Sequence, residues 1–230
     1  MSAARDLLRV ADARSLSADT PMPEPRDPNP EGLRKRNKED KLHRIREAAW
    51  ALFTEHGYDA TTTRAVAERA QIGTGTLFLY AQSKSDLLFL VFRDQLEQLC
   101  QKGFATMPPE GSLLDRLVHI FAGFYHRYAQ VPDLGRRFVR ELLTLSGEHK
   151  RSYEALNQDF LGSLGGVLLA AQARGQARAD LRAPLFAVSL FAVYGFHVLT
   201  WLADEPPVAS KGIAELRALF AEVLAGAAPR

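Results

Sequence analysis

A chain of 230 residues, 47% of them hydrophobic, has enough material for one sizeable domain or two smaller ones. Cys100 is the only cysteine, which excludes an internal disulfide and a cysteine-based zinc site and is typical of a reducing cytosol. The formal net charge is only +2, but residues 33–85 carry ten Lys or Arg against six acids. A surplus of four is by itself more often a solvated surface, but it is the charge that binding to phosphates would require of this part of the chain. No basic segment followed by an apolar core opens the sequence, so we expect a cytoplasmic protein.

Residues 1–36 are expected to form an extension outside the folded domains. Five prolines lie between Pro21 and Pro30, and the segment has little apolar area to bury, which predicts disorder. Its end is basic, with Arg34, Lys35 and Arg36 followed by Lys38. Two interpretations stay open: a passive tail, or an arm that reaches DNA as minor-groove arms do in other folds.

The first helix is predicted over residues 37–56, with one apolar face at the i, i+3, i+4 spacing and Gly57 as its left-handed stop. Two short helical segments then lie so close together that a tight turn must join them. Thr62 is the expected N-cap of the first, and the second is expected from Thr74 to Tyr80. Ser83 is placed to cap the next helix. This is the layout of a helix-turn-helix, in which the second helix enters the major groove.

The residues of this stretch are specific enough to indicate a family. The chain resembles the DNA-binding domain of TetR-type transcriptional regulators, and the matching residues are Thr62, Val66, Ala67, Ala70, Ile72, Gly75, Thr76, Leu77, Tyr80, Ser83, Lys84 and Leu87. Four positions depart from the family pattern: Gln71 for Gly, Gly73 for Ser, Phe78 for Tyr and Ala81 for Phe. The resemblance covers the motif and the helix before it, and elsewhere it extends only to an all-helical layout.

The resemblance implies how the motif contacts double-stranded DNA. The positions that contact phosphates in this family are occupied by Thr63, Thr76, Tyr80 and Lys84. The candidates for base contacts are Arg64, Thr74 and Gly75. Arg64 has the donor pair that guanine requires, and Lys84 opens a helix whose positive end favours phosphate.

From residue 86 onwards the sequence predicts long amphipathic helices. The expected segments are about 86–103, one from Ser112, one from Pro132 to Gly147, and then 152–174, 184–204 and 211–224. No alternating stretch is long enough for a strand. The fold class is therefore all-α, with about nine or ten helices. The resemblance implies a three-helix DNA-binding domain over 37–85 and a larger effector-binding and dimerisation domain over 86–230.

Two of these helices suggest assembly. Segment 152–174 contains three glycines, which are tolerable where another backbone approaches closely. Segment 184–204 is apolar almost all round and is expected to be buried on every side. It is also long enough for a membrane span, which we set aside because it contains Ser189 and His197 and has no second segment like it. By the resemblance, these two helices form the interface of a homodimer that reads a near-palindromic operator.

The same C-terminal domain is expected to hold a cavity for a small, largely apolar or aromatic effector. The candidate lining residues are His119, Phe121, Phe124, Tyr125, His126, Tyr128, Phe138 and Phe160. For any single one of them, the alternative of a place in the ordinary core stays open and is favoured. We expect no cofactor, no metal site and no catalytic residue, since no nucleotide loop, nucleophile elbow or zinc-protease motif is present. The leading hypothesis is a ligand-responsive repressor. The alternatives are an effector-binding or scaffold protein with a degenerate motif, and a small helical enzyme.

Overall fold

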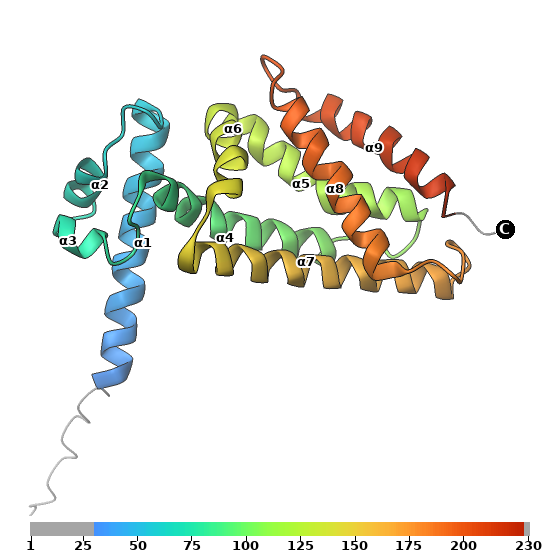
Figure 1. The fold of residues 1–230 in the computed structure, drawn as a ribbon, viewed down its shortest axis with the longest axis horizontal. Coiled ribbons are helices and arrows are strands. Elements are labelled where there is room, and N and C mark those ends of the chain that lie inside the picture. Colours follow the sequence, from blue (N-terminus) through green and yellow to red (C-terminus); the bar gives the residue numbers. More distant parts are fainter. Residues whose placement is uncertain (1–29, 228–230) are drawn as a thin grey trace, which may run out of the picture. The chain divides into compact units, whose positions relative to one another are not determined.

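The computed structural model describes residues 30–227, and within this range the chain folds into nine α-helices and no strand (Figure 1). The helices are α1 Pro30–His56, α2 Thr63–Arg69, α3 Thr74–Leu77, α4 Lys84–Ala105, α5 Leu113–Gln130, α6 Pro132–Glu141, α7 Gly147–Ala173, α8 Ala183–Trp201 and α9 Ala209–Ala225. A 3-10 helix, η1, covers Leu142–Thr144. The predicted all-α class is confirmed.

The first helix begins earlier than its sequence pattern indicates. We expected α1 to start at Asn37, but residues 30–36 are helical. Proline is tolerated here because an N–H in the first turn of a helix has no partner within the helix. The predicted disorder of residues 1–29 falls outside the described part of the chain. Residues 30–37 belong to a different unit from the residues from Lys38 onwards, and the second unit is described below.

Helices α1 to α3 of this unit share a small core. Ile45, Phe53, Val66 and Leu77 are all fully buried in it. The α1–α2 turn is fixed by Thr61, whose buried hydroxyl lies 3.1 Å from the carbonyl of Leu52 and 2.8 Å from that of Gly57. Gly57 has a φ of +82°, the left-handed conformation predicted for the stop of α1.

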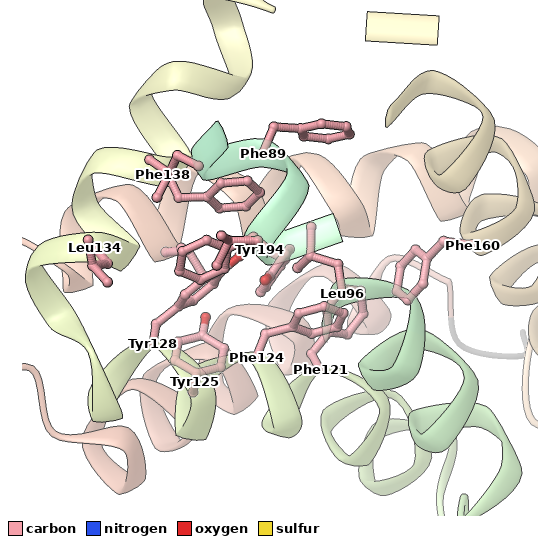
Figure 2. Close-up of a cluster of buried hydrophobic side chains, with 14 of the residues drawn as sticks. Phe89, Leu96, Phe121, Phe124, Tyr125, Tyr128, Leu134, Phe138, Phe160 and Tyr194 are labelled. Carbon is pink, nitrogen blue, oxygen red and sulfur yellow. The ribbon is translucent and has the colours of Figure 1, made fainter. Parts of the chain in front are cut away.

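Helices α4 to α9 enclose a second, aromatic core (Figure 2). Phe92 of α4 stacks on Phe138 of α6, with ring centroids 4.4 Å apart, and Phe121 of α5 contacts Phe160, Tyr194 and Phe220 from three other helices. Close approach of α9 requires Gly212, because a Cβ there would lie 2.7 Å from the indole nitrogen of Trp201.

One expectation for the C-terminal helices is wrong, and another depends on a second copy of the chain. The helix starting at Pro132 does not run to Gly147 but ends at Glu141, and Gly147 is instead the first residue of α7. Helix α8 is not buried on every side within one chain, since Leu185, Phe196 and Leu199 are exposed. By length and composition α8 is long enough to cross a membrane, and 33% of it is buried. One face of α8 packs on α7 and α9, and an apolar face remains open.

Candidate nucleic-acid interface and effector cavity

The start of the recognition helix α3 is open to close approach. Its N-cap is Gly73, which offers no side-chain hydrogen bond, so the serine cap of the family pattern is replaced by bare backbone. Thr74 and Gly75 are exposed, and among the described residues no heavy atom lies within 4 Å of a Cβ built at Gly75. A base edge or a phosphate can therefore reach the backbone of this turn.

Helix α2 presents Thr63 and Arg64 at its first turn. Thr62 caps the helix as predicted, accepting a hydrogen bond from the Ala65 amide at 3.1 Å. The Arg64 side chain is 82% exposed and pairs with Glu68 at 3.0 Å. An exposed i, i+4 pair of this kind contributes only about 0.3–0.5 kcal/mol, so the guanidinium is available to a stronger acceptor.

Thr76, Tyr80 and Lys84, the other candidate phosphate contacts, are all half-buried. Lys84 is the first residue of α4, and its ammonium donates to the carbonyl of Asp59 at 3.0 Å and lies 4.5 Å from the centroid of the Tyr58 ring. The start of α4 is fixed by a reciprocal capping box between Ser83 and Asp86. Lys84 is thus held beside the positive end of a helix, where an anion is favoured.

The motif is tied to helix α6 through residues that sequence reasoning missed. The Tyr58 ring contacts two cations: Lys84, and Arg137 of α6, whose guanidinium lies 4.7 Å from the ring centroid. The Ser85 hydroxyl donates to the Glu141 carboxylate at 2.8 Å. No local pattern identifies these pairs, since their members are 56 residues or more apart in the chain.

A second contact joins the motif to α7. The His149 ring lies 3.2 Å from the Tyr80 carbonyl, to which its Nε2 can donate. The same ring packs edge-on against Phe89 of α4, with centroids 5.4 Å apart. The residue that ends the recognition segment therefore contacts the helix that lines the internal cavity described next.

The cavity has a volume of about 280 Å³ and lies among α4, α5, α6, η1, α7 and α8. Three of the eight predicted residues line it, namely Phe124, Tyr128 and Phe160. Phe121, Tyr125 and Phe138 are buried in the surrounding core instead. The two histidines do not reach the cavity: His119 pairs with the Thr106 hydroxyl at 2.9 Å, and His126 is exposed. Helical periodicity indicates which residues share a face of a helix, but it does not indicate which face lines a cavity.

The cavity wall has polar groups but no charged residue among those that line it. The polar groups are the Tyr128, Tyr153 and Tyr194 hydroxyls, the Asn157 amide and the Cys100 thiol. Burial raises the pKa of Cys100 to about 12 and raises the pKa of all three tyrosines, so all four groups are neutral at physiological pH. A hydrogen bond from the Asn157 side chain partly opposes the rise in the pKa of Tyr153. The exposed Leu143 marks the mouth of the cavity.

Comparison with known proteins identifies one matching family model and several related proteins. Residues 45–91 match the family model described as bacterial regulatory proteins of the tetR family. The fatty acid metabolism regulator protein of Bacillus subtilis is 21% identical over 170 residues, which cover 74% of this chain and 88% of that protein. The transcriptional repressor KstR of Rhodococcus jostii is 31% identical over 106 residues, 46% of this chain and 49% of that one.

Solved structures extend the likeness to the fold of both cores. FadR of Thermus thermophilus, solved with lauroyl-CoA, superposes with a TM-score of 0.65 at 24% identity, over 80% of this chain and 94% of that one. FadR of Bacillus subtilis, solved with stearoyl-CoA, gives 0.59 at 21% identity, over 79% and 95%. At these identities the likeness is one of fold.

Proposed function

Because this chain belongs to the TetR family of bacterial DNA-binding transcriptional regulators, we propose that it is a homodimeric repressor released from its operator by a small, largely apolar effector. The observation that carries this proposal is that α4 and α7 both line the cavity and contact the helix-turn-helix. A ligand that moves either helix would also move the motif. A coupling of about 1–3 kcal/mol is enough to change operator affinity 5- to 150-fold.

For DNA, we propose the division of roles given by the family pattern. Arg64, Thr74 and Gly75 read base edges, whereas Thr63, Thr76, Tyr80 and Lys84 hold phosphates. The exposure of Arg64 and of the first turn of α3 supports the first group. In a dimer, the two α3 helices would enter successive major grooves about 34–36 Å apart.

For assembly, we propose that a second copy of the chain covers the open apolar face of α8. Phe196, Leu185 and Leu199 are exposed there in one chain, which is unfavourable in water. On α7, a Cβ at Gly162 or Gly166 would meet no heavy atom of the described chain within 4 Å, which leaves room for a partner backbone. The interface would combine 152–174 with 184–204, and this arrangement accounts for α8 without a membrane.

For the effector, we propose a molecule whose apolar part fills the cavity between α5, α7 and α8. The aromatic and aliphatic wall supports this class, and the volume of about 280 Å³ is close to the lower end of ligand pockets. Two relatives of the same fold were solved with acyl-CoA molecules, which makes acyl derivatives the first ligands to try.

The alternative is an effector-binding or scaffold protein whose motif no longer engages DNA. Phe78, Gly73 and Ala81 favour it, because each departs from the family pattern at or beside α3. The Ala81 side chain is fully buried, so neighbouring residues cover the position where the family pattern has phenylalanine. Salt dependence separates the two functions, since binding to phosphates releases counterions and a scaffold binds none.

The test is selection of a binding site from a random DNA pool, followed by fluorescence anisotropy at several salt concentrations. For the repressor, Lys84→Ala should lower the slope of log K against log salt by about 0.9 for each phosphate that the variant no longer neutralises. Arg64→Ala should relax preference at one position, at about 1–3 kcal/mol of discrimination. Arg217→Ala, which removes the same charge from α9, serves as the matched control. Failure to enrich any sequence would favour the scaffold.

A further inference from the structure

The polar groups of the cavity come from several helices, and two of them lie on α7. Tyr153 and Asn157 are one turn apart on α7, and Tyr128 and Tyr194 contribute hydroxyls from α5 and α8. Figure 2 shows Tyr128 and Tyr194 within the aromatic cluster that surrounds them. The rest of the wall is aliphatic or aromatic. Tyr128 and Tyr194 hydrogen-bond to each other, which leaves Tyr153 and Asn157 as the polar pair that an all-hydrocarbon ligand would not use.

Asn157 has the largest unused capacity among them. Its amide offers two donor hydrogens and an acceptor oxygen. Within residues 30–227, the one side-chain partner found for it is the Tyr153 hydroxyl. A ligand that covered the amide with hydrocarbon alone would strip it of water and leave these groups unpaired, which is unfavourable.

The charge of the wall limits the ligand further. No Lys, Arg or His is among the residues that line the cavity. The cations next in sequence to wall residues do not line the cavity: Arg127 donates to Gln95 at 2.7 Å, His197 contacts Tyr125 and Glu215, and Arg140 is exposed to solvent. An ionised carboxylate inside the cavity would therefore have no counter-ion and would lose its hydration.

From this arrangement we propose that the cavity binds an uncharged oxygen function on an apolar chain, with Asn157 as the specificity-determining residue, and excludes the ionised free acid. Alcohols, ketones, esters and thioesters share the required chemistry. The proposal rests on the function proposed above, because it assigns the ligand of the same cavity.

The test uses calorimetry on the full chain without DNA and four probes of equal chain length: octan-1-ol, octan-2-one, sodium octanoate and 1-chlorooctane. At pH 8, the alcohol and the ketone should bind at least tenfold more tightly than octanoate and chlorooctane. Lowering the pH towards 5 should recover octanoate binding at least fivefold, since above the pKa of a carboxylic acid its neutral fraction rises about tenfold for each pH unit lowered. The alcohol and the ketone should not respond to this change.

The variant Asn157→Leu should bring alcohol, ketone and chlorooctane to within about twofold of one another. Gln158→Leu removes the same amide from the next, exposed residue and should leave all four affinities unchanged. Octanoate that binds as well at pH 8 as the alcohol, a preference that survives in Asn157→Leu, or no binding of any probe would overturn the proposal. Ligand binding without any change in operator affinity would instead overturn the effector role and leave the assignment of the cavity standing.

Discussion

Gln71 occupies a backbone conformation that side chains rarely adopt. Its φ is +55°, and it follows α2 at the position where the family pattern has glycine. The conformation is maintained because the amides of Gln71 and Ile72 bond back to Glu68 and Ala67 at 3.1 and 3.0 Å. A left-handed backbone destabilises a residue with a Cβ by about 1–2 kcal/mol. A glycine avoids this strain, but part of the gain is lost because glycine has more conformational entropy in the unfolded chain.

Gln71→Gly is therefore expected to raise the free energy of unfolding by about 0.5–1 kcal/mol. Urea denaturation followed by circular dichroism would measure it. Gln71→Ala keeps the strain and should give no gain, so it is the matched control. A glycine variant less stable than the parent would show that the glutamine side chain stabilises the turn.

Arg116 is a second residue whose environment does not suit it. It is 4% exposed on α5, and among the described residues its Nε and Nη1 atoms have no hydrogen-bond partner. Burial lowers the pKa of Arg116, and the nearby Arg174 lowers it further. Arg127 on the same helix differs, because its Nε donates to Gln95 at 2.7 Å and its guanidinium lies 4.5 Å from the centroid of the Trp50 ring.

Arg116→Met should raise the free energy of unfolding by about 1 kcal/mol, because it keeps the apolar stem and removes an unpaired buried cation. Arg127→Met should lower it by about 1–2 kcal/mol, since it breaks a hydrogen bond and a cation–π contact. Thermal unfolding of both variants, measured in parallel, separates the effect of removing an unpaired charge from the general effect of replacing arginine by methionine. Destabilisation by both changes would indicate an anionic partner for Arg116.

At the scale of elements, the sequence of α8 is apolar all round, but only one face of the helix is buried within a single chain. Leu190 and Tyr194 are buried against α7 and the aromatic core, whereas Phe196 remains 71% exposed. A helix with this composition and only one buried face is expected to lie at an interface. The proposed second copy would bury the other face.

Phe196→Glu should weaken self-association and shift the protein from dimer to monomer at micromolar concentration, because a carboxylate would be desolvated at the interface. Analytical ultracentrifugation measures this directly, with circular dichroism to confirm that helix content is kept. Leu143→Glu, at an equally open leucine in η1, should leave association unchanged. A Phe196→Glu variant that remains dimeric would place the interface elsewhere.

At the scale of the whole molecule, the cavity and the motif are joined at few points within the described residues. His149 links α7 to the Tyr80 carbonyl, and the ring of Tyr153, one turn further along the cavity wall, packs against the same Phe89. Glu141 joins Ser85 directly before the cavity residue Leu142. A change in the cavity can therefore reach the motif through short, packed connections.

His149→Ala should reduce the change in operator affinity that octan-1-ol causes by at least threefold, while the affinity for the ligand itself stays within twofold. Anisotropy with and without ligand, combined with calorimetry, separates the two quantities. Lys150→Ala, at the next and exposed residue, is the control. Equal ligand response in the histidine variant would assign the coupling to other contacts, first among them Ser85 with Glu141.

Features that arise within one or two turns could be predicted from the amino-acid sequence alone. Thr62 and Ser83 cap the helices they were predicted to cap, and Ser112 caps the helix expected to begin there, because a cap depends on an N–H three residues away. The all-α class and the position of the helix-turn-helix follow from the 3.6-residue period and from turn chemistry. The DNA contacts stay predictions, since they depend on a partner molecule.

The set of side chains that share the cavity emerged only from the packing of the helices. Phe124 and Tyr125 are neighbours in sequence and both buried, yet only the first lines the cavity, because the crossing of α5 with α7 and α8 sets the wall. Asn157 lies in a polar stretch of α7 with no local sign of its place in that wall. Such positions depend on contacts between helices far apart in the chain, which no local pattern encodes.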